Sequence, residues 1–215
     1  MHRECLTRAA RKVLKAITPV VSSHGFVLAG GTAAALQLGH RLSVDFDFFS
    51  EQSLQLARLL REVQNLDLPI VVLQEEPDTL TLSIAGVKVS FFYYPHTFSG
   101  AYSNLGGVHL AGLVDIASMK LIAIAQRGAK RDYVDLYFIL QDIPFNKIAD
   151  NLVERFGRER VNPIVIGKAL VFFADADADP DPEYLGKATD WKTIKRYFSV
   201  YVKQFTLDLH RSVSG

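Results

Sequence analysis

The sequence predicts an α+β protein, with a sheet and flanking helices in the front half of the chain and helices alone in the rear half. Three observations favour this fold class. Strand patterns recur over residues 26–29, 44–49 and 70–94; a glycine turn joins the first of these to a helix; and beyond residue 112 the apolar residues recur with helical spacing. We therefore expect an α/β core over 1–111 and a helical lobe over 112–215.

Composition sets limits on the function. Hydrophobic residues make up 49% of the chain, which supplies a core, and 24 Lys and Arg balance 23 Asp and Glu. A net charge of +1 excludes the class of basic proteins that hold nucleic acid by bulk charge, so any such contact must be local. No stretch approaches the roughly 18 apolar residues of a membrane span, and no targeting signal opens the chain. We expect a cytoplasmic protein with no membrane partner.

The first segment has the pattern of an amphipathic helix. Leu6, Ala10, Val13 and Ile17 recur at spacings of four, three and four, which predicts a helix that ends before Pro19. The basic residues of this segment lie off the apolar stripe, and we interpret them as a solvated face. The one cysteine of the chain, which lies in the same segment, is interpreted as an ordinary thiol.

Residues 28–49, LAGGTAAALQLGHRLSVDFDFF, combine two features that suit a phosphate and a metal ion. The turn at Gly30 and Gly31 lets the backbone approach an anion, and Thr32 begins a helix whose N–H groups suit a phosphate. A strand over 44–49 puts Asp45 and Asp47 on one face. Two such carboxylates repel unless a cation lies between them, and Mg²⁺ takes one or two carboxylates plus substrate phosphates. The pattern indicates metal-assisted phosphoryl or nucleotidyl transfer.

The remaining patterns predict the strands and helices of the rest of the chain. Further strands are predicted over 70–73, 79–85 and 87–94, and further helices over 54–66, 113–126, 132–141, 147–156, 164–173 and 191–205. The acidic residues of 175–183 resemble a calcium loop, but Pro180 and Gly186 stand where an EF-hand requires Gly and Glu. We interpret this segment as a solvated connection between helices.

A second group of charged residues interrupts the apolar segment GLVDIASMKLIAIAQRGAKRDYVDLYFIL, residues 112–140. Lys120 either extends to the surface or is retained for a partner anion. Asp132 has the position of a helix N-cap, and simple capping is the favoured interpretation. Asp135, three residues on, follows Tyr133 in a mainly apolar segment and is harder to explain as solvated surface. The loop before Asp132 carries a local basic cluster, formed by Arg127, Lys130 and Arg131.

Together these segments resemble a known family. The first is similar to the GG(T)…GHR-x-S-x-D-x-D-F-F signature of the AbiEii/AbiGii toxin family of nucleotidyltransferases, within the DNA polymerase β-like superfamily. The second resembles that family's Met-Lys helix followed by Arg-Asp-x-x-Asp-Leu-Tyr. The matching blocks span residues 28–140. The resemblance implies a minimal nucleotidyltransferase core, a twisted mixed sheet flanked by helices, followed by a helical lobe that packs on the core and completes the active site.

The resemblance also implies roles for the residues of the first block. Gly30, Gly31 and Thr32 would hold the triphosphate of an NTP. Asp45 and Asp47 would be catalytic and would bind Mg²⁺, with two ions supporting in-line attack. The expected activity is transfer of NMP from an NTP to an acceptor hydroxyl, such as a tRNA end, by the toxin of a toxin–antitoxin or abortive-infection system with a cognate antitoxin as partner.

The resemblance also implies roles for residues whose spacing by itself does not indicate a site. Lys120 would contact phosphate and Asp135 would help organise the site, with Asp132 as a lesser candidate. Arg41 is a further candidate phosphate ligand, whereas the residues beside it in the signature shape the turn, namely His40 and Ser43. A phosphate ligand in an apolar helix is expected to tolerate Lys120→Met without loss of stability. We further expect the helix over 191–205 to present the RNA acceptor surface, with Lys192 and Arg196 off its apolar stripe. The stripe consists of Trp191, Ile194, Phe198, Tyr201 and Phe205. The alternative, which the pattern by itself favours, is a core-facing helix with a solvated basic face.

One position departs from the family pattern. The superfamily places a third carboxylate on a later strand, and alternation within VKVSFFYYP puts Ser90 in its apparent place, on one face with Lys88 and Phe92. Three functions therefore stay open at this level: transfer to RNA, transfer to a small molecule such as an aminoglycoside, and binding of nucleotide or RNA by a catalytically degenerate protein.

Overall fold

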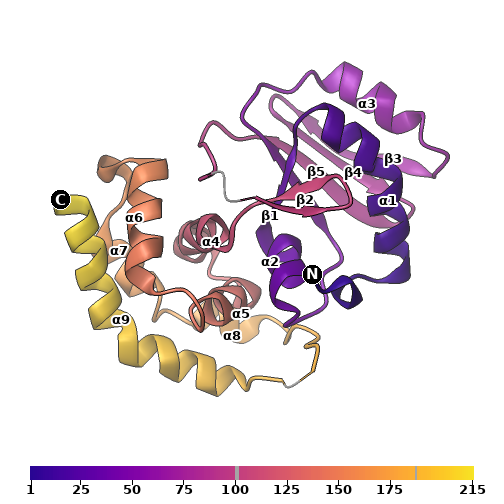
Figure 1. The fold of residues 1–215 in the computed structure, drawn as a ribbon. Helices are drawn as coiled ribbons and strands as arrows, with labels where there is room; N and C mark the ends of the chain where they lie inside the picture. Colours follow the sequence, from indigo (N-terminus) through magenta and orange to yellow (C-terminus); the bar gives the residue numbers. More distant parts are fainter. Residues whose placement is uncertain (100–101, 187) are drawn as a thin grey trace. The chain divides into compact units, whose positions relative to one another are not determined.

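A mixed sheet organises the front half of the chain (Figure 1). The computed structural model describes residues 1–99, 102–186 and 188–215, and the chain divides into two compact units, Met1–Gly112 and Leu113–Gly215. Among the described residues the sheet has seven strands in the order β3-β4-β5-β2-β1-β7-β6. Their bounds are β1 Val27–Ala29, β2 Phe46–Ser50, β3 Ile70–Glu76, β4 Thr79–Ile84, β5 Val87–Tyr93, β6 Ser103–Leu105 and β7 Val108–Leu110.

The centre of the sheet brings two distant segments together. Strand β1 pairs antiparallel with β2, so that Ala29 lies opposite Asp47. Strand β2 pairs in parallel with β5, so that Asp47 lies opposite Ser90. Because residues in register on adjacent strands share a face of the sheet, Asp47 and Ser90 point the same way. The alternate residues of β2, Phe46 and Phe48, are fully buried on the other face.

Three helices accompany this sheet. Helix α1 (Arg8–Ser23) packs against α3 (Leu56–Gln64) and against β5 and β7, whereas α2 (Gly30–Leu38) follows β1 directly and contacts β1 and β2. A short 3₁₀ helix, η1 (Arg3–Cys5), precedes α1 and buries Cys5. The predicted end before Pro19 is wrong, because α1 continues through this residue to Ser23. Proline removes the hydrogen bond to the carbonyl of Lys15, and that residue is exposed, so water can replace it.

In the described part of the second unit, the regular elements are helices. They are α4 (Leu113–Arg127), α5 (Lys130–Ile139), α6 (Phe145–Phe156), α7 (Pro163–Ala169), α8 (Ala174–Ala178) and α9 (Trp191–Ser214), with a short 3₁₀ helix, η2 (Arg158–Arg160), between α6 and α7. Helix α4 contacts α5, α6 and α7, and α9 contacts α6 and α7. Among the described residues, no helix has the length and apolarity that crossing a membrane requires.

The predicted fold class is confirmed, and the differences are shifted element ends and two additional strands. Strand β2 begins at Phe46, so Asp45 lies immediately before the strand and Asp47 within it. The strands β6 and β7 were not predicted from the sequence, because each has only three residues and their pairing partners are set by the tertiary structure. On α9 the residue Tyr201, predicted to lie on the apolar stripe, is 47% exposed, whereas Leu209 further along is buried.

Candidate active site

The turn between β1 and α2 has the backbone that the glycines predict. Gly30 has a φ of +67°, a left-handed conformation that side chains with a Cβ rarely adopt. The N-cap residue of α2 is Ala29, whose side chain cannot accept a hydrogen bond from the first turn. The N–H groups at the start of this nine-residue helix therefore have no side-chain cap, which leaves them suited to an anion.

The carboxylate of Asp47 lies against this turn. A Cβ placed on Gly30 would come within 3.2 Å of Asp47 Oδ2, closer than most real Cβ contacts. Asp47 itself is half-buried, and so is Asp45. The glycine at position 30 thus serves two purposes: it permits the positive φ, and it leaves room for a carboxylate beside the start of α2. A candidate phosphate-binding turn and a candidate metal ligand consequently share one location.

Thr32 joins α2 to the segment that precedes β2. Its hydroxyl lies 2.7 Å from that of Ser43 and also donates a short hydrogen bond to the backbone carbonyl of Asp45. Thr32 and Ser43 are both buried. The hydroxyl of Thr32 therefore holds the chain around Asp45 in place. A contribution of Thr32 to phosphate binding through its backbone N–H stays a prediction.

Arg41 and His40 are buried within the first unit. One Arg41 NH group donates to the carbonyl of Leu42 at 2.9 Å. Burial raises the pKa of the Cys5 thiol to about 11, and the nearby charges of Glu4 and Arg41 act in opposite directions on it. The guanidinium of Arg41 thus lies close to the N-terminal segment, whose Cys5 carbonyl accepts a hydrogen bond from the Ser43 N–H. The role of Arg41 as a phosphate ligand stays a prediction.

Ser90 occupies the position beside Asp47 on the next strand. It is 1% exposed, and the hydroxyl of Thr81 on β4 donates to it at 3.4 Å. The row Asp47, Ser90, Thr81 therefore crosses three adjacent strands on one face. Within residues 1–99, 102–186 and 188–215, no group of three or more His, Cys, Asp or Glu side chains is arranged to hold a metal ion. Two carboxylates with substrate phosphates still form an adequate set of oxygen ligands for Mg²⁺.

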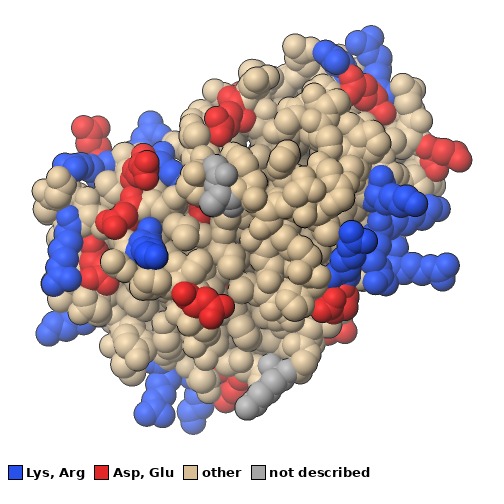
Figure 2. Space-filling model, in the orientation of Figure 1, with Lys and Arg blue, Asp and Glu red and all other residues tan. Residues whose placement is uncertain are grey.

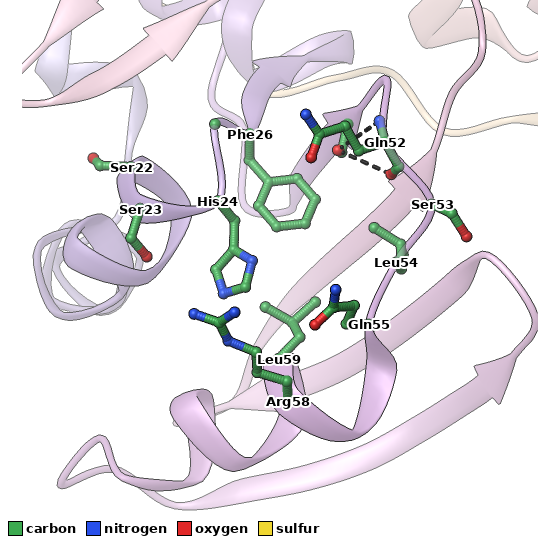
Figure 3. Close-up of a pocket in the computed structure, with 12 residues that line it drawn as sticks. Ser22, Ser23, His24, Phe26, Gln52, Ser53, Leu54, Gln55, Arg58 and Leu59 are labelled. Carbon is green, nitrogen blue, oxygen red and sulfur yellow. Dashed lines mark hydrogen bonds between the residues drawn. The ribbon is translucent and has the colours of Figure 1, made fainter.

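A pocket lies at the opposite end of β1 and β2 (Figure 3). It has a volume of about 460 Å³, and its lining includes Ser23, His24, Phe26, Gln52 and Arg58. Because β1 and β2 are antiparallel, Phe26 and Ser50 stand at one end of the pair and Ala29 and Asp47 at the other. None of the site residues predicted from the sequence lines this pocket.

In the second unit, Lys120 is the centre of a buried ionic cluster. Its Nζ lies 2.7 Å from Asp132 Oδ1 and 2.6 Å from Asp135 Oδ2. Arg127 adds two hydrogen bonds to Asp132, of 2.8 and 3.1 Å. Both carboxylates are fully buried, and Lys120 is 5% exposed. The sequence left open whether Lys120 reaches the surface or meets an anion. The structure shows that it meets two anions supplied by α5.

Asp132 is a member of this cluster and does not cap α5. The N-cap residue of α5 is Ala129, and Asp132 lies inside the helix, so the favoured interpretation of capping is wrong. Burial alone raises the pKa of Asp132, but the charge of Lys120 and the hydrogen bonds and charge of Arg127 outweigh it, so the net pKa lies below the usual value. The ionised form is the stable one here.

The acidic segment before α9 also contacts α5. Asp179 accepts a hydrogen bond from the backbone N–H of Lys130 at 3.0 Å, and Lys130 Nζ donates to the Asp179 carbonyl and lies 3.0 Å from Asp181 Oδ1. Asp177 accepts from Trp191 Nε1 at 2.7 Å. The interpretation of this segment as a merely solvated connection is therefore wrong, because its carboxylates hold the start of α5 and the start of α9.

Sequence reasoning missed a second polar cluster between α4 and α6. Asp115 is fully buried, and Asn151 Nδ2 donates to its carboxylate at 2.9 Å. Arg155 lies 3.6 Å from the same carboxylate and donates to the hydroxyl of Ser118. The signal in the sequence was an aspartate in the first turn of an otherwise apolar helix, but its partners lie 36 to 40 residues away.

Known proteins resemble this chain in sequence or in fold. An uncharacterised protein of Aquifex aeolicus is 34% identical over 205 residues, which cover 93% of this chain and 97% of that protein. Among solved structures, MenT4, a nucleotidyltransferase toxin of Mycobacterium tuberculosis, matches with a TM-score of 0.61 at 15% identity, over 94% of this chain and 85% of its own. A Helicobacter pylori protein proposed to be a nucleotidyltransferase matches with a TM-score of 0.60 at 18% identity, over 95% and 98%.

These two structural matches show the fold. The family is shown by a separate comparison, in which the model of the nucleotidyl transferase AbiEii toxin of type IV toxin–antitoxin systems matches residues 12–205. The match includes the glycine turn, Asp45, Asp47 and the Lys120 cluster. The chain therefore belongs to the AbiEii family of nucleotidyltransferase toxins.

Proposed function

We propose that this nucleotidyltransferase moves NMP from an NTP to a hydroxyl of an RNA acceptor such as a tRNA end, with a divalent metal ion held by Asp45 and Asp47. The observation that carries the proposal is the contact between Gly30 and Asp47. The carboxylate lies against the glycine turn, because a Cβ built on Gly30 would be only 3.2 Å from Asp47 Oδ2. A phosphate at the start of α2 would therefore lie beside a candidate metal ligand.

Each residue of the first unit has a separate part in this proposal. The N–H groups at Gly31 and Thr32 orient the triphosphate, because they point out of the start of α2. Asp45 and Asp47 supply the oxygen ligands, and the hydroxyl of Thr32 fixes the backbone at Asp45. A bound Mg²⁺ would neutralise phosphate charge and favour loss of pyrophosphate. Catalysis by this arrangement relies on positioning and charge neutralisation.

Lys120 has an indirect part. Its ammonium contacts two carboxylates of its own unit, so we propose that it acts as a positioning residue that orients α4 against α5. The predicted participation of Lys120 and Asp135 in one site with Asp45 and Asp47 stays a proposal. Membership of a type IV toxin–antitoxin family implies an antitoxin partner.

The test is transfer from radiolabelled NTPs. Purified protein is incubated with each [α-³²P]NTP, Mg²⁺ and total bacterial RNA, and label in RNA is measured after electrophoresis. We expect incorporation by the wild type and none by Asp47→Ala, while Asp67→Ala, which removes an exposed carboxylate of the same unit, behaves as the wild type. Label that appears on an aminoglycoside and not on RNA would favour the small-molecule acceptor. Equal incorporation by Asp47→Ala would contradict the assignment of the site.

A further inference from the structure

Helix α1 presents one face of exposed cations. Arg8, Arg11, Lys12 and Lys15 are all exposed, and their spacings of three, one and three place them along a single face, over about 10 Å of helix. We call these four residues the α1 basic stripe. Figure 2 shows a group of Lys and Arg side chains in the region that α1 occupies in Figure 1. The opposite face of α1 buries apolar residues, so the stripe has a fixed orientation on the first unit.

The cations of the stripe have no partners within the described part of the chain. None of their side chains makes an ion pair or hydrogen bond with another described residue, and α1 contains no acidic residue. Some cations of the second unit do have partners, because Lys120, Lys130 and Lys195 each contact at least one carboxylate. The stripe is therefore a set of charges without internal neutralisation.

The helix itself gains nothing from this arrangement. Like charges three and four residues apart repel each other, and all four stripe residues stand in such pairs. Arg8 is also the first residue of α1, where the helix dipole favours an anion and disfavours a cation. The first turn of α1 has no acidic residue that would offset it. The charges of the stripe therefore do not stabilise α1, which favours an external anionic partner.

The charge of the first unit is also unevenly distributed along the chain. Residues 1–44 contain six Lys and Arg and one acidic residue, whereas residues 62–87 contain five acidic residues and neither Lys nor Arg. The net charge of +1 excludes binding through bulk charge, but it permits a local basic surface. The stripe is such a surface, and α1 contains no aromatic residue on which a base could stack.

We infer that the α1 basic stripe binds the phosphate backbone of the RNA acceptor, independently of base sequence. The inference rests on the proposed function, because it names the surface that holds the acceptor. It also differs from the expectation that Lys192 and Arg196 of α9 bind RNA. Cations without aromatic neighbours contact phosphates and leave the bases unread, so they position a structured RNA without selecting it.

The test compares a variant that lacks the charges of the stripe with a control variant that lacks an equal charge elsewhere. The stripe variant changes its four residues to Gln, which keeps helix propensity. The control variant changes four exposed cations of the second unit to Gln. None of their side chains makes a hydrogen bond or ion pair with a described residue, and they are Lys147, Arg158, Arg160 and Lys168. Binding of bulk bacterial tRNA without NTP is measured by fluorescence anisotropy over a range of salt concentrations, and Tm is measured for all three proteins.

We expect the stripe variant to bind tRNA at least about tenfold more weakly at 0.15 M salt, with the slope of log K against log salt reduced by about three. Its Tm should equal or exceed that of the wild type, since the repulsion within α1 is gone. The control variant should bind as the wild type does. Equal weakening in both variants would assign binding to net charge and overturn the inference, as would unchanged binding in the stripe variant.

Two further measurements separate this inference from the proposed function. NMP transfer to the same tRNA by the wild type tests the function alone, and normal transfer together with stripe-independent binding would overturn only the inference. Absence of transfer together with stripe-dependent binding would contradict only the proposed function. Polyglutamate that displaces tRNA as well as unlabelled tRNA does would show that the stripe accepts an acidic polypeptide, which also overturns the assignment to RNA.

Discussion

Two pairs of aspartates, one in each unit, have similar spacing in the sequence and opposite environments in the structure. Asp45 and Asp47 are half-buried at the entrance to β2, beside a glycine turn. Asp132 and Asp135 are fully buried in α5. The second pair meets a lysine that lies between its two carboxylates, 2.7 and 2.6 Å from them, and an arginine besides.

The difference separates a carboxylate that stabilises a fold from one that can bind a ligand. A buried carboxylate is tolerated only when a cation and hydrogen bonds compensate its lost hydration, and the cluster around Lys120 supplies both. A half-buried carboxylate keeps access to solvent and therefore to a metal ion. The exposure of the pair, and not its spacing, indicates which aspartates are accessible to a metal ion.

The largest expected effect concerns the half-buried pair. Asp47→Ala or Asp45→Ala should lower kcat for NMP transfer by at least about 10³-fold, because a ligand that stabilises transition-state charge is worth several kcal/mol. The free energy of unfolding should change little, since the side chains are half-exposed. Urea unfolding of the same preparations provides the control. If Asp47→Ala or Asp45→Ala lost as much stability as Lys120→Met, the half-buried pair would be structural in the same way as the buried pair.

The buried cluster should respond in the opposite manner. Lys120→Met removes the ammonium that lies between two buried carboxylates, and we expect it to lower the free energy of unfolding by about 3–5 kcal/mol. The expectation from sequence that this change is harmless is therefore replaced. Combining Lys120→Met with Asp135→Asn should recover part of the loss in urea unfolding, because a buried charge is removed. A single variant as stable as the wild type would show that the cluster contributes nothing.

A substitution at Ser90 can place a buried carboxylate beside the half-buried Asp47. Ser90→Asp adds a carboxylate beside Asp47 on the same face, and without metal it should destabilise the protein by several kcal/mol. Mg²⁺ should restore part of the Tm if the pair binds metal. Thr81→Asp is the matched control, since Thr81 shares this face one strand farther away. Equal Mg²⁺ effects in both variants would contradict a metal site at Asp47.

The smallest expected effect is a dependence of stability on pH. The pKa of Asp132 is lower in the folded protein than in the unfolded chain, so its contribution to stability is complete above the unfolded value of about 4 and is lost as pH falls through the folded value. In urea unfolding between pH 2 and 7, Asp132→Asn should show a shallower loss toward acid than the wild type. Parallel curves would show that Asp132 is not preferentially ionised in the folded state.

Local signals in the sequence predicted most elements correctly. The alternation of Asp45, Phe46 and Asp47 placed the strand within two residues of its observed start, and the glycines predicted the turn before α2. Pro19 misled the prediction of α1, because its missing hydrogen bond can be replaced by water on an exposed turn. The strands β6 and β7 are too short for periodicity to indicate them.

The partners of charged residues could not be predicted in the same way. Thr32 was assigned to phosphate from its place after the glycines, but its hydroxyl bonds Ser43 and the Asp45 carbonyl. The position of Asp132 in the sequence indicated a helix cap, but its side chain forms an ion pair with Lys120. The partners of Thr32 lie 11 and 13 residues away, and the two cations that contact Asp132 lie 12 and 5 residues away. No local pattern describes the path of the loops between them.

The sequence by itself determined the fold class, the glycine turn and the family, because backbone conformation and periodicity depend on residues close together in the chain. Only the tertiary structure decided which charges neutralise each other. It directed Lys120 to Asp132 and Asp135 and left the α1 basic stripe without a carboxylate. The physical reason is that burial and Coulomb energy depend on distances in space, and these arise only when segments far apart in the sequence pack together.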